Sequence, residues 1–175
     1  SVVQATFMHI LSLAGEGPYY DACVKNGTYS DMSMFTDPSV CWTELIGKTI
    51  GVIGMGNIGS RVARVAEAFG MNVCYYSTSG TGHCTEYPSL PLERLMAESD
   101  IITIHAPLNE RTNGLIGKDE LAMMKPTAYI VNMGRGGIID EQALADAVSN
   151  GTIAGAALDV FVTEPLPADN PLLHT

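Results

Sequence analysis

The feature that most constrains this fold is a series of five short apolar runs, each followed by a stretch of different character. The runs are KTIGVIG, NVCYYS, DIITIH, TAYIVN and IAGAALDV, and all lie after Gly47. Apolar runs without alternation are typical of strands that are covered on both faces. The segments 58–69, 91–98, 118–124 and 141–149 have helical periodicity. Repeated strand–helix units predict an α/β fold, a doubly wound parallel sheet with right-handed crossovers.

Composition excludes several classes of partner. The 175 residues carry a formal net charge of −10, and 46% of them are hydrophobic. No basic run offsets this charge, so we expect neither nucleic acid nor a membrane as a partner. The four cysteines lack metal-ligand spacing, which predicts reduced thiols and no metal site. No run reaches the roughly 18 apolar residues of a transmembrane helix, and no signal peptide is evident, so we expect a cytoplasmic protein.

Residues 1–40 precede the strand–helix pattern. Val3, Phe7 and Ile10 lie at helical spacing, which predicts a helix over residues 2–13. Residues 15–40 have no clear period and indicate a connector. We therefore divide the chain into 1–40, a helix and connector, and 41–175, the domain that holds the sheet. The chain lacks an initiator Met and ends within a Pro-rich phrase, so we expect a piece of a longer two-domain protein.

A glycine-rich loop follows the first of these strands. Gly54, Gly56 and Gly59 fit the pattern G-x-G-x-x-G and open a predicted helix, which together indicate a dinucleotide-binding domain. In such a loop the first glycine permits a tight turn, the second lets backbone approach a pyrophosphate, and the third lets the helix pack closely on the sheet. We expect Asn57 and Ile58 to contact the pyrophosphate as well. The alternative is a glycine turn that binds no ligand.

The residue that binds the adenosine ribose in such domains is usually an Asp or Glu about 20 residues further on. Here Ser77 occupies that place, and we predict that the hydroxyls of Ser77, Thr78 and the next serine bind the ribose. No Lys or Arg lies between Arg64 and Arg94 to attract the 2′-phosphate of NADP, and only His83 could help. The cofactor predicted is NAD, with NADP not excluded.

Three later stretches carry a resemblance to a known family. They are HAPLNERTNGLIG (105–117), VNMGRGGIIDEQAL (131–144) and ALDVFVTEP (157–165). With the glycine loop they resemble the D-isomer-specific 2-hydroxyacid dehydrogenases, matched over about residues 45–173. The resemblance implies a Rossmann-type domain of an oxidoreductase that transfers a hydride between NAD(P)H and a small 2-oxo or 2-hydroxy acid. YYSTSG and HAPLNERT look most like the glycerate dehydrogenase or hydroxypyruvate reductase types, which implies hydroxypyruvate, glyoxylate or a similar substrate.

The resemblance also implies roles for individual residues. Arg135 would bind and activate the 2-oxo acid, although position alone favours a solvated loop arginine. Glu164 would pair with a catalytic histidine, and Asp159 would face the nicotinamide carboxamide unless it merely ends a strand. The helix at 2–13 resembles one that makes dimer contacts in relatives, which implies a homodimer. The residues expected to line the cofactor, mostly through backbone and shape, are Ala106, Pro107, Thr112 and Met133.

The catalytic histidine itself does not match any histidine of this chain. His174 comes too early for the family position, and the resemblance makes His105 structural. We therefore expect the general acid, the last strand and most of the substrate domain to lie outside these residues. The chain is predicted to bind cofactor without useful turnover. Two rivals remain: an NAD-sensing, corepressor-like binding protein, and a Rossmann domain for another nucleotide ligand.

Overall fold

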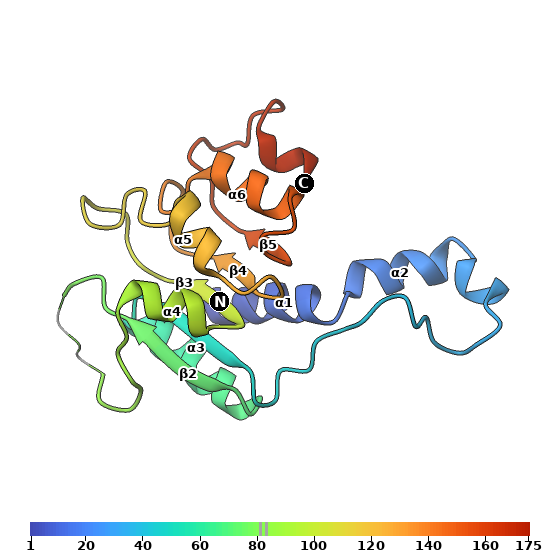
Figure 1. The fold of residues 1–175 in the computed structure, drawn as a ribbon, viewed down its shortest axis with the longest axis horizontal. Coiled ribbons are helices and arrows are strands. Elements are labelled where there is room, and N and C mark those ends of the chain that lie inside the picture. Colours follow the sequence, from blue (N-terminus) through green and yellow to red (C-terminus); the bar gives the residue numbers. More distant parts are fainter. Residues whose placement is uncertain (81, 83) are drawn as a thin grey trace.

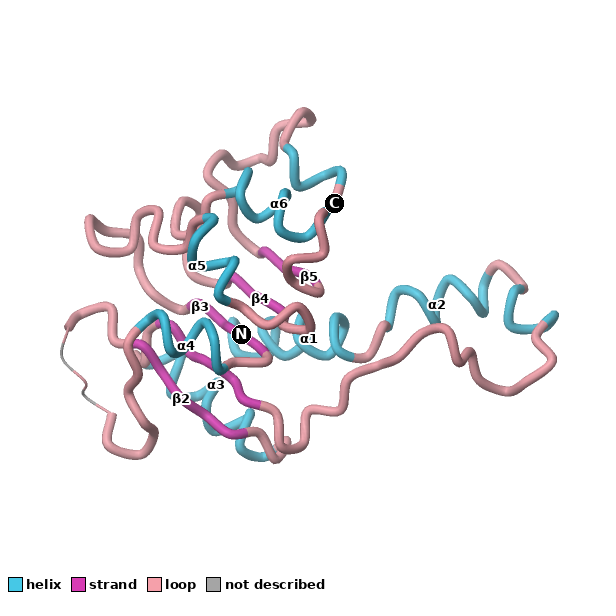
Figure 2. The backbone as a smooth tube through the Cα atoms, in the orientation of Figure 1, coloured by secondary structure: helices cyan, strands magenta, loops and turns pink. Residues whose placement is uncertain are grey.

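The computed structural model describes residues 1–80, 82 and 84–175, and its centre is a five-stranded sheet (Figure 1). Its strands are β1 (Thr49–Ile53), β2 (Asn72–Tyr76), β3 (Ile101–Ile104), β4 (Tyr129–Asn132) and β5 (Gly155–Leu158). Their order is β2-β1-β3-β4-β5, and every neighbouring pair is parallel (Figure 2). Each of the five apolar runs contains one strand, so the predicted parallel sheet is confirmed.

Four helices follow the strands as the periodicity predicts. They are α3 (Asn57–Ala68), α4 (Leu92–Glu98), α5 (Lys118–Met123) and α6 (Glu141–Ser149). Asp140 caps α6, since its Oδ1 accepts a hydrogen bond of 2.9 Å from the amide of Ala143. No helix within the described residues is long and apolar enough to cross a membrane.

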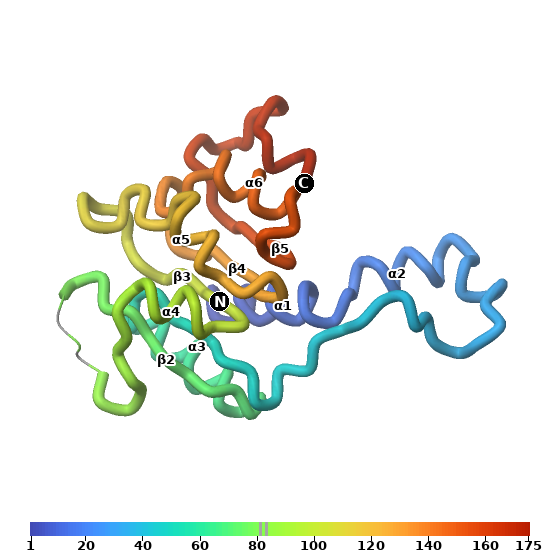
Figure 3. The backbone as a smooth tube through the Cα atoms, viewed as in Figure 1, coloured from blue at the N-terminus to red at the C-terminus, as the bar shows by residue number. Residues whose placement is uncertain are grey.

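The N-terminal region contains more structure than predicted. The helix α1 (Val2–Ala14) is confirmed, but the expected connector also holds α2 (Gly17–Lys25) and a 3₁₀ turn, η1 (Thr28–Asp31). Periodicity missed α2 because Cys23 is its one buried residue, so no apolar stripe marks it. Figure 3 shows α2 and η1 projecting away from the sheet. The division at residue 40 stays a prediction. Within residues 1–40, α1 packs on the sheet, whereas α2 contacts α1 and η1.

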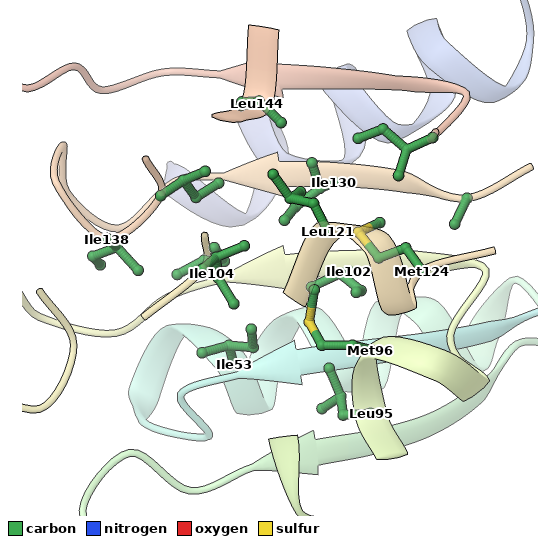
Figure 4. Packing of buried hydrophobic residues seen from close by; sticks show 14 of the residues in the cluster. Ile53, Leu95, Met96, Ile102, Ile104, Leu121, Met124, Ile130, Ile138 and Leu144 are labelled. Carbon is green, nitrogen blue, oxygen red and sulfur yellow. The ribbon is translucent and has the colours of Figure 1, made fainter. Parts of the chain in front are cut away.

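The sheet is covered on both faces, as its apolar strands require. Helices α1 and α3 pack on one face, where Ile10, Val52 and Val62 belong to a single buried cluster. Helices α4, α5 and α6 cover the other face, where Ile102, Leu121 and Leu144 are fully or almost fully buried (Figure 4). With both faces closed, the exposed loops at the strand ends are left to form a binding site.

Two details of the fold lie at the margins of the packed region. Val62 and Ala66 of α3 are buried, whereas Ile58 and Phe69, which lie at helical spacing from them, are each 38% exposed. Both lie at the ends of the helix. In addition, Ser89 forms a single parallel bridge to Tyr75 on β2, so a short extended segment stands at that edge.

Candidate functional site

The strand order creates a crevice at the carboxyl ends of β1 and β3. The chain leaves β1 for β2 on one side and then returns to β3 on the other, so the loops after β1 and β3 diverge. In open α/β sheets, ligands bind at such a switch point. A cavity of about 290 Å³ lies there, and its lining includes the glycine loop, the end of β2 and the loop after β3. The lining residues are Gly54, Met55, Gly56, Tyr75, Ser77, Thr78, Ser79, His105, Pro107 and Asn109.

The glycine loop has the geometry that its spacing predicts. Gly54 has a φ of +96°, which favours glycine, and a Cβ there would lie 2.9 Å from the amide nitrogen of Ala106. A Cβ on Gly59 would overlap the carbonyl oxygen of Gly54, so this glycine lets α3 approach β1. A Cβ on Gly56 would meet nothing within 4 Å.

Open space beside Gly56 exposes the start of α3 to the cavity. Gly56 is the N-cap residue, and both Asn57 and Ile58 are exposed. The first amides of a helix have no acceptor within the helix, and the positive end of its dipole attracts anions. The loop therefore offers room, amide donors and a favourable field for a diphosphate, which the net charge of −10 would otherwise repel.

Hydroxyl groups follow the end of β2, and an arginine from another loop lies beside them. Ser77, Thr78 and Ser79, the residues expected to bind the ribose, line the cavity. Arg111, from the loop after β3, donates a hydrogen bond of 2.8 Å from Nη1 to the carbonyl oxygen of Ser79. From the sequence we considered only cations between Arg64 and Arg94 and so missed Arg111, which the fold brings next to Ser79. The prediction for His83 lies outside the described residues.

The loop after β3 is held by buried side chains. Thr112 is fully buried and donates a 2.6 Å hydrogen bond from Oγ1 to the carbonyl of Pro107, while it accepts one of 2.9 Å from the amide of Asn109. Ala106 is 2% exposed. The side chains of Ala106 and Thr112 thus shape the loop from inside, and the residues of the loop that line the cavity are His105, Pro107 and Asn109.

His105 lies at the start of the same loop and lines the cavity. Its Nε2 is 2.9 Å from Oγ1 of Thr103, and burial lowers its pKa from 6.5 to about 4. The ring is therefore neutral at pH 7. Its Nδ1 is buried and makes no hydrogen bond within the part of the chain that the structure describes.

A buried asparagine shapes the turn after β4. Asn132 is 2% exposed, accepts a 3.0 Å hydrogen bond from the amide of Gly134 and donates one of 3.0 Å to the carbonyl of Arg135. The guanidinium of Arg135 is exposed, and its Nη1 donates to the carbonyl of Gly134 at 2.7 Å. Met133, the neighbour of Asn132, is 7% exposed and belongs to the core. Asn132 was not singled out from the sequence, where it reads as the end of a strand.

The segment after β5 carries the two predicted carboxylates. Asp159 is exposed, and its amide donates to the carbonyl of Asn132 at 3.1 Å, which continues the ladder by one residue. Glu164 is also exposed and accepts a 3.0 Å hydrogen bond from the amide of Phe161. Glu141, at the start of α6, accepts a 2.7 Å hydrogen bond from the amide of Val162 and so anchors this segment. Sequence reasoning missed Glu141 because its partner is 21 residues away.

Close backbone contacts join these loops into one surface. A Cβ on Gly134 would lie 2.7 Å from the carbonyl oxygen of Ala106, and one on Gly136 would overlap the backbone of Phe161 and Val162. The loops after β1, β3, β4 and β5 are thus neighbours in that order, as parallel strands require. Arg135 and Glu164 share this edge, but each is hydrogen-bonded to backbone rather than to the other. An exposed guanidinium on the same edge as the open start of a helix can bind a small carboxylate or another anion.

Comparison with known proteins gives matches along almost the whole chain. The sequence profile of the D-isomer specific 2-hydroxyacid dehydrogenase NAD binding domain matches residues 7–175, farther than the expected 45–173. Glyoxylate reductase of Aeropyrum pernix is 52% identical over 134 residues, which cover 74% of this chain and 39% of that protein.

Solved structures agree with this match. An acyclic imino acid reductase, Bsp5, in complex with NADPH and D-Arg superposes with a TM-score of 0.88 at 32% identity, over 99% of this chain and 53% of that chain. D-Lactate dehydrogenase from Aquifex aeolicus, complexed with NAD and lactic acid, gives 0.86 at 33% identity, over 99% and 55%. This chain thus spans about half the length of these two solved relatives, and its match covers 39% of the glyoxylate reductase of Aeropyrum pernix. It belongs to the D-isomer specific 2-hydroxyacid dehydrogenase family and is the NAD-binding domain of such a protein.

Proposed function

We propose that this domain serves an enzyme that reduces a small 2-oxo acid, with glyoxylate and hydroxypyruvate as the favoured candidates. The observation that carries the proposal is the continuous edge on which the glycine loop, the Arg135 turn and the Glu164 segment meet. The name of the Aeropyrum pernix relative, a glyoxylate reductase, supports this choice of substrates.

The residues at this edge fit the cofactor. The open space at Gly56 suits a diphosphate, which the amides of Asn57 and Ile58 would bind at the start of α3. Ser77 and Thr78 would bind the ribose hydroxyls from the cavity wall. When bound, the nicotinamide supplies a hydride. The residues proposed to line or hold the rest of the cofactor are Gly54, Gly59, Ala106, Pro107, Thr112, Met133, Arg135 and Asp159.

Two charged groups are proposed to act on the substrate. The guanidinium of Arg135 presents a planar fork that suits a carboxylate and polarises a neighbouring ketone oxygen as negative charge develops there. The Asn132 clamp holds the turn from which this guanidinium projects. Glu164 would accept a hydrogen bond from a histidine supplied by another part of the protein and keep that histidine protonated. This chain alone should bind NADH without useful turnover, because general acid catalysis contributes roughly 10²–10⁴-fold.

The test uses the complete protein and a panel of 2-oxo acids. We expect NADH oxidation with glyoxylate or hydroxypyruvate, and a loss of about 10²–10³-fold in kcat/KM for Arg135→Gln, as for loss of one transition-state donor. Arg94→Gln removes an equal charge from α4, where Arg94 pairs with Glu98, and should change kcat/KM by less than about twofold. A complete protein that binds NADH but reduces none of these acids would instead favour the NAD-sensing alternative.

We also propose that the protein is a cytoplasmic homodimer. The projecting N-terminal region exposes large apolar side chains, with Phe35 at 89% and Trp42 at 64%. A cavity of about 490 Å³, lined in part by Leu11, Trp42 and Phe69, lies at its base, away from the glycine loop. A second copy would cover this surface, and four free cysteines suit a reducing compartment. Sedimentation should give a dimer that Phe35→Asp weakens, whereas Met123→Asp, on α5, should leave it intact.

A further inference from the structure

A positive charge lies beside the segment proposed to bind the ribose, although the sequence around β2 carries none. Residues 77–80 read Ser-Thr-Ser-Gly and carry no charged side chain. Arg111 reaches this segment from the loop after β3, 32 residues away from Ser79 in the sequence. Its Nη1 lies 2.8 Å from the carbonyl oxygen of Ser79 and would be 3.6 Å from a Cβ on Gly80. The guanidinium therefore lies along the segment that closes the cavity on the ribose side.

The base of this arginine is rigidly placed. The amide of Arg111 donates a 2.9 Å hydrogen bond to Oδ1 of Asn109, and Asn109 itself lines the cavity. The next residue, Thr112, is fully buried and is hydrogen-bonded to Pro107 and Asn109. Both ends of the side chain are thus held, one by this loop and the other by Ser79, which limits the entropy lost when a ligand binds.

The charge of Arg111 is available to a ligand. The guanidinium has five N–H donors, and one of its nitrogens is engaged with Ser79. In the described part of the chain, the ion pairs are Lys25–Asp21, Arg94–Glu98 and Lys125–Asp100, so no carboxylate neutralises Arg111. No acidic residue ends β2 to repel a phosphate either, since Ser77 stands there.

We propose that Arg111 is the specificity residue that lets this domain accept NADPH as well as NADH, by binding the 2′-phosphate of the adenosine ribose. The inference rests on the proposed cofactor site and deepens it. A guanidinium fork suits a phosphate, and NADP-binding domains commonly place an arginine near the end of this strand. Here the arginine comes from the loop on the other side of the switch point. The proposal extends the prediction of NAD, with NADP not excluded, to acceptance of both cofactors.

The test measures dissociation constants of NADH and NADPH for this chain, from nicotinamide fluorescence, so it needs no turnover. We expect the two constants to lie within about tenfold of each other, and Arg111→Ala to weaken NADPH by about tenfold or more while it changes NADH by less than about threefold. Arg111→Lys keeps the charge but lacks the planar fork, so its NADPH dissociation constant should lie between those of the wild type and Arg111→Ala. Arg94→Ala is the matched control and should leave both constants unchanged. Thermal unfolding of each variant shows whether it is folded.

The possible outcomes separate the role of Arg111 from the existence of the cofactor site. A wild-type chain that binds NADH but binds NADPH more than about 100-fold more weakly overturns the role of Arg111 and leaves the proposed function standing. The same holds if folded Arg111→Ala changes both constants equally. A wild-type chain that binds neither nucleotide overturns the cofactor site itself. Added salt should weaken NADPH more than NADH if a surface charge pair is responsible.

Discussion

Substitution of two glycines in the same loop should separate folding from binding. In Gly56→Ala, the new methyl group meets nothing within 4 Å, and the φ of −90° with ψ of −157° suits alanine. The stability of the protein should therefore change by no more than about 0.5 kcal/mol. The methyl group would, however, occupy the space through which a diphosphate approaches the amides of α3. Loss of one or two charge-assisted hydrogen bonds should weaken NADH binding by about 10- to 100-fold.

Gly59→Ala should have the opposite pattern. Its Cβ would overlap the carbonyl oxygen of Gly54 and lie 3.1 Å from Cγ1 of Val52, so α3 must move off β1. Overpacking of this kind costs about 1–3 kcal/mol, whereas alanine gains up to about 1 kcal/mol over glycine in a helix. Because the overlap is with backbone, the cost should lie at the upper end of this range, and a net loss of about 2 kcal/mol remains. Because the helix start moves with it, NADH binding should weaken too.

The two variants are compared by urea unfolding, followed by circular dichroism, and by NADH titration of the folded protein. The expected result is a stable Gly56→Ala that binds poorly, beside a destabilised Gly59→Ala. If Gly56→Ala binds NADH as tightly as the wild type, then the diphosphate does not pass beside residue 56, and the reasoning about the cavity is refuted. A Gly59→Ala variant as stable as the wild type would contradict the close packing of α3 on β1.

Three further changes test the loops around the site. His105 has a folded pKa of about 4, below its ordinary 6.5, so the unfolded chain takes up its proton first as the pH falls. Its contribution to stability is complete above pH 6.5 and is lost between pH 6.5 and 4, by up to roughly 3 kcal/mol. In His105→Asn, the free energy of unfolding in urea should therefore depend less on pH across that range; the same pH dependence as in the wild type would contradict this. Asn132→Ala removes two hydrogen bonds from a buried turn and should cost about 2–3 kcal/mol by urea unfolding. Asn132→Asp keeps the acceptor for Gly134 but buries a charge whose second oxygen faces the carbonyl of Arg135, so it should be at least as destabilising at pH 7; an Asn132→Ala variant as stable as the wild type would count against the clamp. Asp140→Ala removes the cap of α6 and should lower stability by about 1 kcal/mol, while Asp140→Ser restores most of it; no change in the unfolding midpoint would show that the cap contributes nothing.

The sheet and its four following helices could be predicted because their signals are local. A run such as DIITIH is apolar at three of the four positions that β3 buries, and α6 starts where Asp140 can cap it. Parallel connections then place the loops that follow the strands at one edge of the sheet. Helix α2 was missed because it buries a single residue and thus lacks an apolar period.

By itself the sequence determined the fold class, the glycine loop and the family, since each depends on residues close together in the chain or on motifs in a fixed order. Tertiary structure decided what lies across the crevice: Arg111 beside Ser79, Glu141 anchoring Val162, and Gly136 against Phe161. These contacts join residues 21 to 32 positions apart, between loops whose paths no local pattern specifies. Their formation depends on how far each loop extends beyond its strand, which only the packed sheet determines.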